Sequence, residues 1–239
     1  MSYDYLYNGV SMYYDLMYVN EESYKIEAEK VVSLASQHGL LNGSRLLDIA
    51  CGTGAQAEYL QKHYNVTGID LNENILQIVR KKVESAEFIK ADMCNFNLPA
   101  KFDIVVNLYG SIGHAANYSQ LCSAIECVYK HLKKDGIFIL TPWSTKESFE
   151  EALVTKSKTI NLSGFCRMET VSRLSDDKVK VEMHHLVSDN LNVTYHNYTQ
   201  TITLFSEDEY ISSIVKTGFK IIKRLSQQEF RMGAFICIL

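Results

Sequence analysis

The sequence has only two prolines, Pro99 and Pro142, and no proline-rich stretch. A long rigid linker between separate domains is therefore not expected. No uninterrupted apolar run approaches the roughly 20 residues that cross a bilayer, so no membrane-spanning helix is predicted. The first residues lack both a basic leader and an apolar segment, so we also expect no signal peptide.

Basic clusters and paired cysteines are absent as well. Lys81-Lys82 and Lys133-Lys134 are isolated pairs in a chain of net charge −4, which argues against an extended nucleic-acid interface. The six cysteines include no Cys-x-x-Cys pair and lie mostly within apolar runs. This usage is typical of reduced, buried thiols, and we expect a cytoplasmic protein.

Hydrophobic residues make up 46% of the 239 residues, which is enough to bury the core of one large domain. Up to Trp143, short apolar runs alternate with segments of helical periodicity, and this alternation predicts an open, mostly parallel sheet. Strands are predicted at 45–50, 66–70, 87–90, 102–108 and 137–140, and helices at 10–17, 21–38, 55–63, 72–83 and 118–132.

The periodicity changes after Trp143. Residues 158–205 alternate with a period of two and carry turn residues at 175–177 and 189–190. This pattern predicts an inserted antiparallel meander of about four strands, which we place at 155–205. A helix at 207–217 and a closing hairpin of 219–225 and 234–239 complete the chain. The predicted fold is α/β and Rossmann-like, with seven strands, a reversed last strand and an inserted meander.

The segment 46–54 carries the clearest functional pattern. An apolar strand leads through Asp48 into a turn with Gly52 and Gly54, where the backbone can approach a ligand closely. Twenty-two residues after Asp48, a second strand ends in Asp70, a position from which a carboxylate can accept both hydroxyls of a ribose. The two features predict an adenosine-containing cofactor. A strand-turn-helix without a ligand is the alternative.

Asp48 distinguishes between adenosine cofactors. A carboxylate four residues before the first glycine suits a ligand with an ammonium and a sulfonium, and it repels a pyrophosphate. The turn resembles motif one of the class I S-adenosylmethionine (SAM) methyltransferases. The resemblance implies a SAM site, formed by Asp48, Ala50, Cys51, Gly52, Gly54, Asp70, Leu71, Asp92, Met93 and Leu108.

Two of these residues also have a direct chemical interpretation. Asp92 follows the third strand, where its carboxylate can accept the adenine amino group, and Met93 offers a soft surface to the ring. A turn cap is the alternative role for Asp92.

The segment 108–114 follows the fourth strand, where a methyl donor and its acceptor would meet. Methyl transfer needs a lone pair held in line with the departing sulfur. An amine nucleophile is partly unprotonated at cellular pH, so His114 needs only to orient it and help it lose a proton. A loop histidine bonded to the backbone is the alternative.

Several further segments resemble the sugar N-methyltransferases, which convert TDP-linked 3-amino-3,6-dideoxyhexoses to the N,N-dimethylamino sugars desosamine and mycaminose. The matching segments run in order over nearly the whole chain: Tyr14-Asp15-Leu16, Ser111-Ile112-Gly113-His114, Thr141-Pro142-Trp143, Glu182-Met183-His184, Ile202-Thr203-Leu204-Phe205 and Arg231.

The resemblance implies catalytic roles for Tyr14 and His114 and an acceptor site formed by Tyr14, Ser111, His114, Trp143 and Arg231. In this interpretation Trp143 lines the sugar pocket and Arg231 meets the pyrophosphate. It also implies a dimer. Two departures, Ser144 in place of a second tryptophan and an Arg231 outside a glycine-rich turn, leave the identity of the sugar open.

The implied organisation is one methyltransferase domain, 1–239. It has an N-terminal helical lid (1–44), a SAM-binding core (45–143), a meander that covers the acceptor site (155–205) and a closing helix and hairpin (206–239). No metal site is predicted, because the adjacent His184 and His185 face opposite sides of a strand. Two alternatives stay open: a methyltransferase of another small molecule such as glycine, a polyamine or a phenol, and a SAM-binding module without catalysis.

Overall fold

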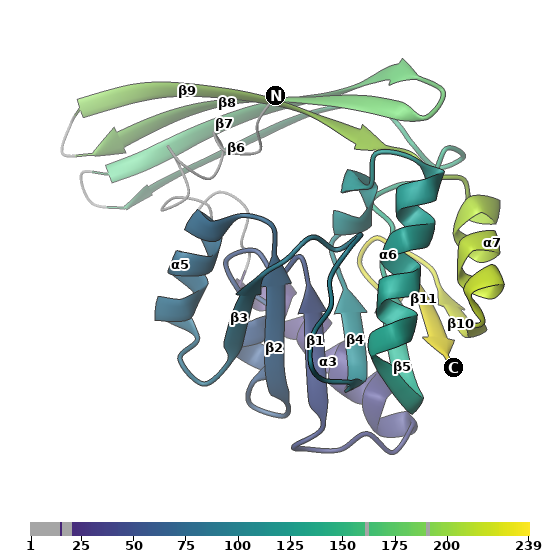
Figure 1. Cartoon of the computed structure of the whole chain (residues 1–239). Helices are drawn as coiled ribbons and strands as arrows, with labels where there is room; N and C mark the ends of the chain where they lie inside the picture. Colours follow the sequence, from purple (N-terminus) through teal and green to yellow (C-terminus); the bar gives the residue numbers. More distant parts are fainter. Residues whose placement is uncertain (1–14, 16–20, 161–162, 190–191) are drawn as a thin grey trace.

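A computed structural model describes residue 15 and residues 21–160, 163–189 and 192–239. The predicted helix at 10–17 and Tyr14 lie outside the described residues. The structure has two parts, an α/β layered core and a separate antiparallel sheet that lies across the carboxyl ends of the central strands (Figure 1).

The core sheet has seven strands in the order β10-β11-β5-β4-β1-β2-β3. Its five parallel strands are β1 (Arg45–Ile49), β2 (Asn65–Asp70), β3 (Glu87–Lys90), β4 (Phe102–Asn107) and β5 (Leu132–Leu140). The hairpin of β10 (Lys220–Leu225) and β11 (Ala234–Ile238) closes the sheet, and β11 runs antiparallel to β5. The predicted α/β fold with a reversed last strand is therefore confirmed.

The helices are α3 (Glu21–Gln37), α4 (Ala57–Leu60), α5 (Glu73–Lys82), α6 (Tyr118–His131) and α7 (Glu207–Thr217). Neighbouring residues of β1 point to opposite faces of the sheet, each into its own apolar cluster. Leu46 packs in the cluster that includes Val31 of α3, whereas Leu47 packs in the cluster that includes Leu121 of α6. Buried apolar side chains on both faces of a strand are expected in a sheet covered by helices on both sides.

The helix after β1 and the fifth strand differ most from the sequence prediction. The helix expected at 55–63 is only one turn long, Ala57–Leu60, because the cofactor turn continues through Gln56. The fifth strand begins at Leu132 instead of 137, and its pairing with β4 is irregular between Phe102 and Ile104. The cap predicted at Asn72 is confirmed, since its side chain accepts hydrogen bonds from the backbone of Asn74 and Ile75.

The insert forms a four-stranded antiparallel sheet of β6 (Ala152–Ile160), β7 (Ser163–Ser175), β8 (Lys178–Asp189) and β9 (Asn192–Thr203). Its inner face carries a buried apolar cluster that includes Val181, Met183 and Ile202, with Trp143 packed against it. The predicted meander is confirmed. None of the helices in the described part of the chain has the length and apolar character needed to cross a membrane.

Candidate active site

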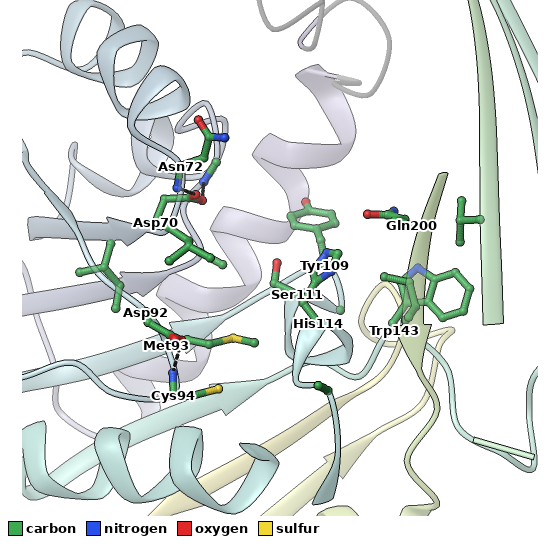
Figure 2. A pocket seen from close by; sticks show the side chains of 18 of the residues that line it. Asp70, Asn72, Asp92, Met93, Cys94, Tyr109, Ser111, His114, Trp143 and Gln200 are labelled. Atoms are coloured by element: carbon green, nitrogen blue, oxygen red, sulfur yellow. Dashed lines mark hydrogen bonds between the residues drawn. The ribbon is translucent and has the colours of Figure 1, made fainter. Parts of the chain in front are cut away.

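The carboxyl edge of the core sheet and the inner face of the insert enclose one cavity of about 910 Å³. Predicted cofactor residues line one end and predicted acceptor residues line the other (Figure 2). The predicted site residues that line it are Ala50, Gly52, Asp70, Leu71, Asp92, Met93, Ser111, His114, Trp143 and Arg231. Four predicted cofactor residues, Asp48, Cys51, Gly54 and Leu108, do not line it; Asp48, Cys51 and Leu108 are buried behind the wall.

The turn after β1 is held by Asp70 at the end of β2. One oxygen of Asp70 accepts the backbone N–H of Gly52 at 3.0 Å, and the other accepts that of Asn72 at 2.9 Å. Ala50 and Gly52 both have left-handed backbones, with φ of 58° and 55°. Asp70 therefore fixes the turn while its carboxylate borders the cavity, where its remaining lone pairs can accept hydroxyls.

Glycine is required at position 54 for packing against α5, and not, as expected, for close approach of the backbone to a ligand. A Cβ there would lie 2.2 Å from Val79 Cγ2 of α5. Its φ of +76° also disfavours a side chain. The residue lets the turn pack against α5, and it does not itself border the cavity.

Asp48 lies beneath this turn with its side chain almost fully buried. It is 3% exposed, and its Oδ2 atom has no hydrogen-bond partner within the described part of the chain. Burial and the nearby charge of Asp70 raise the pKa of Asp48 to about 7. An unsatisfied buried carboxylate beneath a ligand turn fits a cationic group, such as an ammonium, on the other side.

Asp92 and Met93 both border the cavity after β3. The Asp92 carboxylate accepts the backbone N–H of Cys94 at 2.8 Å, so Asp92 does cap its own turn, the role considered as the alternative. One carboxylate can perform both roles because its two oxygens offer about four acceptor positions.

Asp15, the one described residue before Glu21, contacts the cofactor turn and α5. Its carboxylate accepts a hydrogen bond from the hydroxyl of Thr53 in the cofactor turn and pairs with Lys82 at 2.9 Å. Asp15 is the neighbour of Tyr14 in the sequence, and the role of Tyr14 stays a prediction.

The acceptor end is shaped by a sharp turn after β4. Tyr109 and Gly110 have left-handed backbones, and the 3-10 helix Ser111–His114 follows directly. A Cβ on Gly110 would lie 2.3 Å from Trp143 Cα. Glycine therefore allows the 108–114 segment and Trp143 to approach each other at the backbone.

His114 is half-buried, and its imidazole borders the cavity (Figure 2). Burial lowers the pKa of His114 to about 4. The ring is therefore neutral at physiological pH, where it can accept a hydrogen bond without adding a positive charge to the site.

Arg231 lies on the loop between β10 and β11 and is tied to α3. Its Nη1 donates to Ser23 Oγ at 2.9 Å, and its guanidinium lies 5.4 Å from the centre of the Tyr109 ring. Tyr24 stacks on the same ring at 4.4 Å. Tyr24 and Tyr109 both border the cavity, and neither carries a sequence motif that would predict this position.

Comparison with known proteins agrees with this geometry. Residues 46–136 match a family described as methyltransferase domain. The chain is 30% identical to a dTDP-3-amino-3,6-dideoxy-alpha-D-glucopyranose N,N-dimethyltransferase of Streptomyces fradiae, over 90% of this chain and 86% of that protein. It is also 30% identical to a dTDP-3-amino-3,4,6-trideoxy-alpha-D-glucopyranose N,N-dimethyltransferase of Streptomyces venezuelae, over 87% and 89%.

A solved structure shows the same architecture. DesVI of Streptomyces venezuelae superposes with a TM-score of 0.87 at 27% identity, and the match covers 95% of this chain and 97% of DesVI. The sequence similarity and the fold thus extend over both the core and the insert. The chain belongs to the family of dTDP-amino-sugar N,N-dimethyltransferases.

Proposed function

We propose that the protein transfers methyl groups from SAM to the amino group of a TDP-linked amino-deoxysugar and gives the N,N-dimethyl product. The observation that carries this is the 910 Å³ cavity between the core sheet and the insert. It joins Asp70 and Asp92 at one end to a neutral His114 at the other, as direct transfer between two bound molecules requires.

The cofactor end fits SAM by its donor and acceptor groups. Asp70 would accept the ribose hydroxyls and Asp92 the adenine amino group. The charge of Asp48, buried behind the turn, would attract the ammonium without contacting it. When bound, SAM supplies a methyl group on a positively charged sulfur, which leaves as a neutral thioether.

The acceptor end of the cavity would catalyse the transfer mainly by positioning the acceptor, and less by supplying charge. His114 would accept a hydrogen bond from the amine and so direct the nitrogen lone pair into the cavity. Trp143 would lie against the sugar ring, and the planar fork of Arg231 would bind the diphosphate. Tyr14 is proposed to contact the acceptor by its place in the sequence pattern alone.

The proposal is tested by incubating the protein with SAM and TDP-3-amino-3,6-dideoxyglucose and following the products by mass spectrometry. Sequential gain of two methyl groups is the expected result. Turnover of glycine, a polyamine or a phenol in place of the nucleotide sugar would identify a different small-molecule methyltransferase. Binding of SAM without release of S-adenosylhomocysteine from any amine would identify a binding module.

We also propose that the protein is a cytoplasmic homodimer. The outer face of the insert supports the dimer, because it exposes Met168, Leu186 and Tyr195, which are 49%, 47% and 56% accessible. Light scattering of the purified protein measures the mass directly, and a monomer at micromolar concentration would contradict this arrangement.

Asp48→Asn is expected to stabilise the protein without cofactor while weakening SAM binding. The pKa of Asp48 is raised to about 7, so the stability it contributes is complete below its unfolded pKa of about 3.9 and is lost as the pH rises through 7. At pH 8 the variant avoids burying a charge, and we expect a gain of at least about 1 kcal/mol, or 2–4 °C in melting temperature. Loss of the charge opposite the ammonium should weaken SAM binding about tenfold.

Thermal melts of both proteins at pH 5 and pH 8, together with calorimetric SAM titrations, check this prediction. The difference in melting temperature should widen with pH and level off above about pH 7. A difference that stays constant with pH would show that Asp48 is not the titrating group.

Gly110→Ala is expected to raise the KM for the acceptor about tenfold with little change in SAM affinity. The left-handed backbone costs about 1–2 kcal/mol for alanine, and the new Cβ would displace Trp143 from the acceptor end. Initial rates at varied acceptor concentration measure the effect. Gly39→Ala is the matched control, since Gly39 has a similar φ of +75° but no described atom within 4 Å of its Cβ position. An equal rise in KM in both variants would contradict a specific contact.

A further inference from the structure

Two charged side chains of the insert, Arg167 and Glu169 of β7, border the cavity at a distance from the reacting groups. Arg167 Nη1 lies 3.5 Å from Glu169 Oε2, and the two side chains are only 11% and 16% exposed. Their charges offset each other. The pair therefore presents N–H donors beside a carboxylate acceptor with no net charge.

The sheet register places this pair at the far end of the cavity from His114. Ile202 reaches the 3-10 helix, because a Cβ on Gly113 would lie 2.8 Å from its Cγ2 atom. Ile202 pairs with Val179, and along β8 from there Met183 pairs with Glu169 and His185 with Arg167. At about 3.3 Å per residue, Glu169 is about 13 Å and Arg167 about 20 Å along the sheet from Ile202.

An apolar strip fills the interval between the two ends. Val181, Met183 and Ile202 border the cavity along the inner face of β8 and β9. Met183 lies directly opposite Glu169 in the register. A flat ring placed on this strip would have its edge at the charged pair and a polarizable thioether beneath it.

The phosphates of a nucleotide sugar have a better partner in Arg231 than in the Arg167–Glu169 pair. Arg231 borders the cavity from the core side, and its guanidinium is tied to Ser23 of α3. Lys156 is opposite Arg167 in the register and is close enough to Arg231 to be affected by its charge. Burial, Arg167, Lys158 and Arg231 together lower the pKa of Lys156, as expected where cations gather. Both a phosphate and a nucleobase could accept N–H donors from Arg167. Glu169 favours the nucleobase, because a carboxylate repels a phosphate but accepts a hydrogen bond from a base.

We propose that Arg167 and Glu169 bind the edge of the acceptor's nucleobase and select a base in which a ring N–H adjoins a carbonyl oxygen. This inference rests on the proposed function. Glu169 accepts the ring N–H, and Arg167 donates to the carbonyl. Thymine and uracil have this edge, and guanine shares it, whereas cytosine and adenine have no ring N–H there.

The test is calorimetric titration of the full-length protein with TDP, CDP, GDP and TDP methylated at ring N3. Methylation removes the N–H and leaves the diphosphate unchanged. We expect N3-methyl-TDP and CDP to bind about 10–100-fold more weakly than TDP, the usual effect of losing a hydrogen bond to a charged group. In Glu169→Gln, TDP should weaken by a similar factor, and N3-methylation should then cost little more.

Glu182→Gln is the matched control, since Glu182 lies on the outer face of the same sheet and its pairing is with Lys180. It should bind all four ligands as the unaltered protein does. GDP binding at least as tightly as TDP would support the same edge recognition with a purine.

Two outcomes would overturn the inference: equal binding of TDP and N3-methyl-TDP, or a Glu169→Gln effect of the same size on inorganic pyrophosphate. Turnover of the TDP-amino sugar is measured in parallel. Turnover without base discrimination rejects only the role of this pair. Base discrimination without turnover rejects the proposed function and leaves the base site standing.

Discussion

Replacing His114 with asparagine is expected to lower kcat about 100-fold while SAM affinity stays within a factor of two. General base assistance typically raises a rate by a factor of about 10²–10⁴. For His114 we expect a factor at the lower end of this range, because a histidine whose pKa is lowered to about 4 is a weak base. Its larger contribution is geometric, since it would hold the nitrogen lone pair toward the cofactor end of the cavity. Initial rates at saturating substrates and calorimetric SAM titrations measure the two quantities separately.

His184→Asn provides the matched control for this prediction. His184 lies on the outer side of β8, where its ring contacts the Tyr195 hydroxyl at 2.6 Å, so the same substitution there should leave kcat unchanged. The pH profile adds a second readout. Because the pKa of His114 is near 4, the acidic limb between pH 5 and 8 follows the acceptor amine and should keep its position in the variant. Parallel losses of kcat and SAM affinity would show that His114 is a structural residue.

Most of the fold could be predicted from the alternation of strand and helix patterns along the sequence. Leu46 and Leu47 show why, because buried strands covered on both faces are apolar without a period, whereas β8 and β9 alternate with a clear period of two. The ends of the elements were harder to predict than their order. The helix Ala57–Leu60 was predicted too long, at 55–63, since the helix-compatible residues before it belong to the cofactor turn.

The site was predictable where a motif occupies a strand end, and less so where side-chain direction decides. Asp70 and His114 border the cavity as expected, but Asp48 shares the face of β1 that carries Leu46 and is buried beneath the turn. Arg167 and Glu169 were missed because alternating polar residues in a strand normally face solvent. Only the placement of the insert over the carboxyl edge of the core turns their side of the sheet inward (Figure 1).

Asp70→Ala is expected to weaken SAM binding by two to three orders of magnitude, more than any other single change at the cofactor end. The carboxylate accepts the backbone N–H groups of Gly52 and Asn72 and would also accept the ribose hydroxyls. Hydrogen bonds to a charged group contribute about 1.5–3 kcal/mol each, and two lost to the ligand correspond to the expected change in affinity. Calorimetric titration with SAM measures it, and Asp70→Asn should lose less because the amide keeps one acceptor.

Asp103→Ala separates loss of a cofactor contact from general damage to the sheet. Asp103 in β4 also accepts a backbone N–H, from Arg45 at 2.8 Å, and pairs with Lys133 at 3.0 Å, but it does not border the cavity. Its removal should lower the melting temperature and leave SAM affinity unchanged, because Arg45 begins β1 and the cofactor turn follows the other end of that strand. If Asp70→Ala bound SAM as tightly as Asp103→Ala, the carboxylate would serve the turn alone, and the ribose would have to be held by other residues.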